Sequence, residues 1–215
     1  SLVGSEMCIR DRAWYNASKS SEINYHINKH QGSFSCPRYQ ITENGITFES
    51  NYQEGGLIVE KTVDEDGVII EIYNDFRGLT VGRKENGLLT AFVYDDAGNL
   101  RYILPPGLSG THNRTDADMK QLAYWYDYDS RGRLITKKLP GVKAARFLYD
   151  PADRLVAEQS AHHASGAWRF YGYDNADRQV IALDCMATDS QAGTFASICR
   201  TASLSSSGTF AGYLL

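Results

Sequence analysis

The chain has 215 residues, a formal net charge of −4 and a pI of about 5.7. This acidic balance argues against a nucleic-acid-binding protein, and no apolar run approaches the roughly eighteen residues that a membrane helix needs. The 14 Tyr and 19 Gly favour β-structure with many turns over a helical bundle.

Residues 1–12 lack a strand or helix period and the apolar core of a signal peptide. They resemble the translated read-through of a sequencing-library adapter, so we set them aside as non-native and expect the natural N-terminus to be missing. Three cysteines remain, at Cys36, Cys185 and Cys199. A disulfide between Cys185 and Cys199 is one alternative. Free, partly buried thiols are favoured, because the cysteines form no regular framework and have no metal-ligand spacing.

Residues 13–37 form a polar segment that we expect to be largely irregular. Ile23, Tyr25 and Ile27 alternate with polar residues and predict one short strand. This alternation argues against a helix that would pair His26 with His30 as metal ligands.

Hairpin signals begin at residue 38. Two alternating runs, 39–42 and 46–49, flank the turn pair Asn44-Gly45. The runs 57–63 and 68–73 flank an acidic turn at 64–67, which lacks the spacing of a calcium-binding loop and predicts a solvated hairpin turn. A further strand, 88–94, follows the turn pair Asn86-Gly87.

The clearest unit lies at residues 124–141. Tyr124, Tyr126 and Tyr128 alternate with other residues and predict a strand. Asp129 then predicts a tight turn, because its carboxylate can accept hydrogen bonds from backbone N–H groups two or three residues on. Gly132 can take a positive φ there. The chain returns as a strand over 133–139, so the unit is a hairpin with the signature Tyr-Asp-x-x-Gly-Arg-Leu.

This signature recurs along the chain, with a degenerate copy at 74–78, so we interpret its residues as structural repeat positions. Asp153 and Asp177 occupy the glycine position, and we expect their turns to be slightly strained or of another type. The signature residues are Tyr94, Asp95, Gly98 and Leu100; Tyr128, Asp129, Gly132 and Leu134; Tyr149, Asp150 and Leu155; and Tyr173 and Asp174.

Over about residues 50–182 the chain resembles the YD-repeat (Rhs-repeat) family, most closely its bacterial branch. The stretches VYDDAGNLRYILPP, YDYDSRGRLITKKLPG and FLYDPADRLVAEQ carry the resemblance. It implies an all-β fold in which antiparallel YD-repeat hairpins form part of a curled β-sheet shell. In bacterial members the shell encloses a C-terminal toxin, and in the animal teneurins a related shell serves cell adhesion. The implied partners are the remainder of the shell and its C-terminal cargo, in a secreted or cell-surface protein.

We therefore expect a repeat region at 38–182 and a Ser/Ala/Gly-rich, truncated tail at 183–215. Within the tail, 193–196 and 208–211 echo each other and predict two weak strands or a low-complexity loop. A capping-box pattern at 115–118, followed by apolar residues at helical spacing, predicts one short helix near 115–123.

No pattern of catalytic residues emerges, so we expect neither an enzyme nor a cofactor or metal site. A pair of carboxylates could hydrolyse glycosides, but the signature aspartates share one turn position, which a structural role explains better. Residues 107–111 approach a nucleophile elbow but lack its final glycine, and His162-His163 is expected to be solvated.

The aromatic residues leave one alternative function open. As an exposed platform they could stack on sugars, which makes glycans a further candidate partner and an adhesin or carbohydrate-binding surface the alternative function. We favour their packing between neighbouring strands. The residues concerned are Tyr124, Trp125, Tyr126, Tyr128, Trp168, Phe170, Tyr171 and Tyr173.

Overall fold

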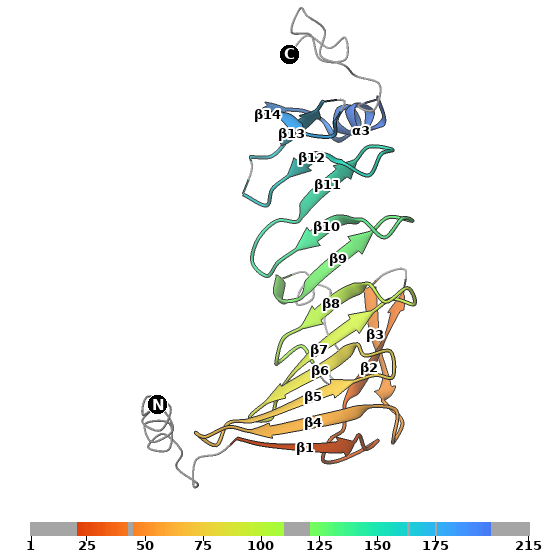
Figure 1. Ribbon diagram of the computed structural model, residues 1–215, viewed down its shortest axis with the longest axis vertical. Helices are drawn as coiled ribbons and strands as arrows, with labels where there is room; N and C mark the ends of the chain where they lie inside the picture. The colour runs from red at the N-terminus through yellow and green to blue at the C-terminus, as the bar shows by residue number, and fades with distance from the viewer. Residues whose placement is uncertain (1–20, 43–44, 110–120, 163, 175, 199–215) are drawn as a thin grey trace, which may run out of the picture. The chain divides into compact units, whose positions relative to one another are not determined.

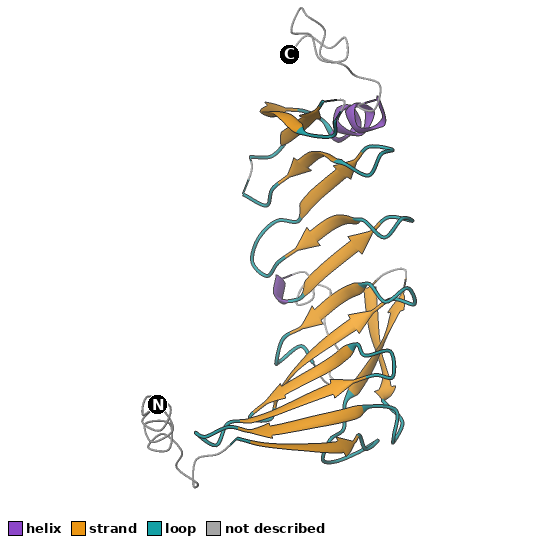
Figure 2. Cartoon of the chain, in the orientation of Figure 1, coloured by secondary structure: helices purple, strands orange, loops and turns teal. Residues whose placement is uncertain are grey.

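The computed structural model describes residues 21–42, 45–109, 121–162, 164–174 and 176–198. These residues are mostly antiparallel β-strands, and the ten-residue helix α3 (Asp189–Ile198) is the helix bounded among them. The predicted all-β, antiparallel class is therefore confirmed (Figures 1 and 2). The chain divides into two compact units between Met119 and Lys120.

The first unit contains a meander of antiparallel strands and a separate hairpin. The meander follows the strand order β1 (Glu22–Ile27), β4 (Ile58–Val63), β5 (Ile69–Asn74), β6 (Thr80–Glu85), β7 (Leu88–Tyr94) and β8 (Leu100–Leu104). The hairpin consists of β2 (Pro37–Thr42) and β3 (Gly45–Asn51), whose two connecting residues, 43 and 44, lie outside the described residues.

The predicted strand at Ile23–Ile27 is part of this sheet. It pairs with β4 along its whole length, from Glu22 opposite Val63 to Ile27 opposite Ile58. The short strand predicted within residues 13–37 is therefore present, and its partner strand lies more than thirty residues along the chain.

One face of the first sheet is covered by the β2–β3 hairpin and the loop before it. The buried cluster there comprises Cys36, Leu57, Val59, Tyr73 and Val81. The fully buried Asn28 closes the edge of this cluster, and all its side-chain polar atoms are bonded. Its Nδ2 donates to the carbonyls of Tyr52 (3.2 Å) and Gln53 (2.9 Å), and its Oδ1 accepts from Leu57 N–H (2.8 Å).

Gly82 lies where the covering loop comes closest to the sheet. A Cβ at this position would stand 2.9 Å from Cys36 Sγ. We therefore expect Gly82→Ala to lower the free energy of unfolding by about 1–3 kcal/mol through overpacking. Adding Cys36→Ala should recover much of this loss in urea unfolding. A Gly82→Ala variant as stable as the wild type would contradict this packing.

The second unit is a further antiparallel meander with α3 against it. Its strands are β9 (Tyr124–Tyr128), β10 (Leu134–Lys138), β11 (Ala145–Tyr149), β12 (Leu155–Gln159), β13 (Ala167–Tyr173) and β14 (Gln179–Met186). β14 extends beyond residue 182, where the repeat region was expected to end. Of the helix expected near 115–123, residues 121–123 are described: 121 and 122 are helical, and Ala123 is not. Residues 115–120 lie outside the described residues.

The weak strand or loop expected at 193–196 is wrong, because these residues lie within α3, and the matching segment 208–211 lies outside the described residues. A capping box starts the helix: Thr188 Oγ1 accepts from Gln191 N–H (3.3 Å), and Gln191 Oε1 accepts from Thr188 N–H (2.8 Å). Ala192 and Ala196 then bury small side chains against the sheet, where Trp168 lies fully buried.

An arginine fixes the beginning of α3 to the sheet. Arg146 Nη1 and Nη2 donate to the two carboxylate oxygens of Asp189, at 2.8 and 2.6 Å. Its guanidinium carbon lies 5.0 Å from the centroid of the Trp168 ring. The fork geometry of the guanidinium therefore links helix, strand and aromatic core.

Candidate functional site

The signature turn is built around the carboxylate that begins it. Asp129 Oδ1 accepts hydrogen bonds from the N–H groups of Arg131 (2.9 Å) and Arg133 (3.0 Å). The Gly132 N–H donates to the Asp129 carbonyl (3.0 Å). The carboxylate's donors therefore stand two and four residues on, whereas we had expected two or three. The N–H three residues on, that of Gly132, donates instead to the backbone carbonyl of Asp129.

Six aspartates in the described part of the chain make this turn. In each, the aspartate N–H donates to the carbonyl four residues on, and its carbonyl accepts from the N–H three residues on, at 2.9–3.1 Å. The carboxylate also accepts from the N–H four residues on, at 2.8–3.0 Å. The sequence analysis identified five of them as copies of the signature. It predicted the turn at Asp64 only as a hairpin turn, because Val63 stands where the signature has tyrosine. The six are Asp64, Asp75, Asp95, Asp129, Asp150 and Asp174.

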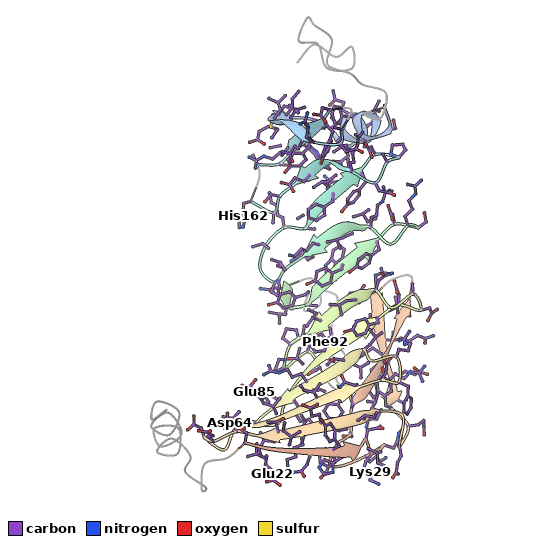
Figure 3. The ribbon with its side chains drawn as sticks, in the orientation of Figure 1. Glu22, Lys29, Asp64, Glu85, Phe92 and His162 are labelled. Carbon is purple, nitrogen blue, oxygen red and sulfur yellow. The ribbon has the colours of Figure 1, made fainter. Side chains whose placement is uncertain are left out.

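A β-bulge follows five of the six turns and re-aims the returning strand. The register of strand pairing skips one residue in each case, which increases the local twist. The turn at Asp64 has no such skip, because Val63 faces Ile69 and Thr62 faces Ile70 in unbroken register. The turn at Asp64 lies at the same end of the strands as Glu85 (Figure 3). The bulged residues are Val81, Arg101, Ile135, Val156 and Val180.

The turns that lack glycine keep the same geometry. Asp153 and Asp177 have φ of 66° and 58°, against 76° for Gly132. The N–H of each donates 3.1 Å to the carbonyl of its turn's first aspartate. The alternative of another turn type is therefore wrong, and the positive φ that we expected to strain these residues is present.

Arginine side chains link successive turns in the second unit. Arg133 Nε donates to Asp129 of its own turn (2.7 Å), and its Nη1 donates to Asp153 Oδ1 of the next (2.7 Å). Its guanidinium carbon lies 4.8 Å from the centroid of the Tyr149 ring. Asp153, which stands at the glycine position of its turn, thus forms an ion pair with the arginine of the preceding repeat.

The next pair of repeats makes the same link. Arg154 binds Asp150 of its own turn (2.7 Å), stacks 5.0 Å from the centroid of the Tyr173 ring and donates to Asp177 Oδ1 (2.7 Å). The signature arginine, which we had not counted among the site residues, is therefore the group that joins repeats.

The signature tyrosines also reach back to the preceding repeat. The hydroxyls of Tyr94, Tyr149 and Tyr173 each donate to the backbone carbonyl two residues past the glycine position of the preceding turn. The pairs are Tyr94 with Thr80 (3.0 Å), Tyr149 with Leu134 (3.0 Å) and Tyr173 with Leu155 (2.7 Å). We call these linked turns of the second unit, residues 129–133, 150–154 and 174–178, the turn ladder.

Hydrogen bonds lower the pKa of several turn carboxyls. For Asp174 the Arg178 N–H, and then the Arg178 side chain, hold the pKa below its ordinary value of 3.8. Burial opposes this effect at Asp75, but hydrogen bonds from Leu79 N–H and Arg77 outweigh it, so its pKa is also lowered. A carboxyl with a depressed folded-state pKa stabilises the fold above its unfolded-state pKa and loses that contribution as pH falls through the folded value.

We therefore expect acid to destabilise the chain. The urea midpoint should be steady near neutrality and fall progressively as pH is lowered from about 5 to about 2. Asp75→Asn should lower the midpoint near neutral pH and make its fall in acid smaller. Identical acid dependence in this variant and the wild type would contradict a structural role for the Asp75 carboxylate.

Two glycines provide a matched test of the turn. Gly132 has φ +76° with open space around its Cβ position, so Gly132→Val should cost about 1–3 kcal/mol through backbone strain alone. Gly193 lies in α3 with equal space, where valine is no worse than glycine, so Gly193→Val should change stability by less than about 0.5 kcal/mol. Equal urea midpoints for the two variants would count against the turn.

The aromatic residues considered as a platform for sugars are all half-buried or buried. Trp168 is only 1% exposed and packs among Ala157, Ala192 and Phe170. The strand Tyr124–Tyr128 is half-buried throughout. The burial of Trp168 removes one of the two tryptophans among these residues from a sugar-stacking surface, whereas Trp125 is half-buried.

The histidine and cysteine side chains considered in the sequence analysis do not gather into a site within the described residues. His162 is exposed in the β12–β13 loop (Figure 3), and Cys36 is a buried free thiol whose pKa burial raises to about 12. Cys185 is also free and half-buried, while its possible partner Cys199 lies outside the described residues. Among the residues that can be placed, no three His, Cys, Asp or Glu side chains gather as a metal site would require. No helix in the described ranges is long and apolar enough to cross a membrane.

A shallow pocket of about 340 Å³ opens between α3 and the turn ladder. Its lining includes the side chains of Leu148, Tyr149 and Ala196 and the two arginines Arg131 and Arg133. Both arginines already pair with Asp153, at 2.7 Å, so their charges are engaged within the fold.

Comparison with known proteins gives a limited result. No family model matches the chain, and neither does any curated protein sequence. A crystal structure of TcdB2-TccC3-Cdc42 matches with a TM-score of 0.37 and 12% sequence identity over 78% of this chain. The match spans 11% of the length of that other chain.

Proposed function

We propose that the chain is a structural segment: part of the wall of a β-shell in a large secreted or cell-surface Rhs-type protein that encloses a C-terminal, toxin-like cargo. On this proposal it is not an enzyme, and it contributes containment. Its partners are the rest of the shell and the cargo.

The observation that carries this proposal is the use of the turn carboxylates. A catalytic acid needs an oxygen that can reach a substrate, whereas Asp150 is 1% exposed and both its oxygens are bonded within the fold. The same aspartate recurs in six turns with the same backbone partners. Repetition of one bonded geometry is what a wall made of similar units requires.

The links between repeats support containment further. Arg133 and Arg154 each tie their hairpin to the next through an ion pair, a ring contact and a bond within their own turn. Such links oppose local opening of single hairpins, which is the step that would admit a protease.

Containment can be tested with the complete protein. Limited proteolysis of the native protein should leave a C-terminal segment protected, and that segment should arrest growth when it is expressed without the repeats. Asp150→Ala should increase cleavage of the segment, while the exposed control Lys143→Ala should not. A C-terminal segment that is cleaved as fast with its repeats as without them would overturn the proposal.

A further inference from the structure

The acidic residue at the fourth turn position follows a rule within this chain. Asp153 and Asp177 occur in turns whose preceding repeat in the sequence ends in arginine, at Arg133 and Arg154. Where the preceding repeat carries another residue there, the fourth position is glycine: Leu79 precedes the turn of Gly98, and Asn99 precedes that of Gly132. Arginine in one repeat is therefore matched by aspartate in the next.

Arg178 holds the same turn position as Arg133 and Arg154, but no aspartate of a following repeat pairs with it among the described residues. Its Nε donates to Asp174 of its own turn (2.8 Å), as Arg133 and Arg154 do in theirs. Its side chain is 79% exposed, against 23% and 18% for those two. Among the residues that the structure describes, its one ion-pair partner is Asp174.

The strand after Arg178 also exposes a residue that earlier repeats bury. Val81 and Val156, the bulge residues of two earlier turns, are at most 4% exposed and pack in clusters with the tyrosine of the following repeat, Tyr94 and Tyr173. Val180 holds the corresponding bulge position and is 50% exposed. β14 is the last strand of its sheet in the described part of the chain.

We propose that Arg178, the Gln179 carbonyl and Val180 form a docking site for one further β-hairpin whose turn reads Tyr-Asp-x-x-Asp, supplied as the next repeat of the same polypeptide. The second aspartate pairs with Arg178. The tyrosine ring covers Arg178 and Val180, and its hydroxyl donates to the Gln179 carbonyl, two residues past Asp177. This inference rests on the proposed function, because it assigns the partner of the wall's exposed edge.

A cyclised hairpin of residues 167–186 carries this motif in Tyr173, Asp174 and Asp177, and it provides the probe, with Cys185→Ser to prevent oxidation. Cyclisation holds its strands together, since isolated hairpins are marginally stable. Fluorescence anisotropy should show saturable binding of the labelled hairpin to the 215-residue chain. Asp177→Asn in the hairpin, or Arg178→Gln in the chain, should weaken binding about three- to tenfold, and the two together should weaken it little further.

The matched control is Arg77→Gln, which removes an exposed turn arginine that pairs with its own Asp75. It should leave binding unchanged. Absence of binding, equal binding to the Arg178→Gln chain, or equal loss with Arg77→Gln would overturn the docking site. These results leave the protease-protection experiment unaffected, so failure of this site and failure of containment are distinguishable.

Discussion

Replacing Asp150 with alanine is expected to lower the free energy of unfolding by about 3–5 kcal/mol, as removal of one member of a buried charged pair typically does. The Asp150 side chain is fully buried and accepts hydrogen bonds from Ala152 N–H (2.8 Å) and Arg154 N–H (3.0 Å). Its other oxygen binds Arg154 Nε at 2.7 Å. Alanine would leave these donors without acceptors and release the arginine that links two repeats.

Urea unfolding monitored by circular dichroism provides the measurement. Asp150→Asn keeps one carbonyl oxygen and should cost less than alanine, because the backbone donors keep an acceptor. The exposed Asp66→Ala, in the turn at Asp64, serves as the control and should stay within about 0.5 kcal/mol of the wild type. An Asp150→Ala variant within about 1 kcal/mol of the wild type would show that this carboxylate does not hold the turn.

Replacing Trp168 with alanine should cost a similar amount, about 3–5 kcal/mol, through loss of buried apolar surface and the cavity left behind. The ring packs against Ala157 and Ala192 and lies beneath Arg146. Its loss should also free α3, because Ala192 belongs to the helix and Arg146 binds Asp189 at the helix start.

Two comparisons sharpen this prediction. The Trp168 Nε1 has no hydrogen-bond partner among the described residues, so Trp168→Phe removes a buried unpaired donor and should cost much less than alanine. Trp125 is half-buried, and Trp125→Ala should cost less than Trp168→Ala. Hydrogen exchange should report early opening of α3 in Trp168→Ala; unchanged protection of the helix would contradict its anchoring by this residue.

The hairpins were predictable because their signals are local. Alternating residues with Asn86-Gly87 or Asp129 between them specify strand, turn and return within a dozen residues. The structure has strands at these places, and Asn86 and Gly87 both have positive φ. Agreement of this kind needs no knowledge of distant contacts.

Features that depend on distant residues were missed or left open. The pairing of β1 with β4 and the burial of Asn28 under Leu57 require segments about thirty residues apart to meet. The links from Arg133 to Asp153 depend on how hairpins stack, although the co-occurrence of the two residue types was visible in the sequence. The start of α3 was missed because the tail was interpreted from its Ser/Ala/Gly composition, although Thr188 and Gln191 stand at capping-box spacing.

We propose that the turn aspartates hold a wall together and serve no chemistry. It is tested most directly by urea unfolding of six single variants, Asp→Ala at Asp64, Asp75, Asp95, Asp129, Asp150 and Asp174. All six variants are expected to lose stability, with Asp150, whose side chain is fully buried, losing most and the 25%-exposed Asp174 losing less. Carboxylates kept for catalysis or binding commonly reduce stability, so removing one raises it or leaves it unchanged. A variant in this series that unfolds at a higher urea concentration than the wild type would contradict the claim and mark that aspartate as a functional group.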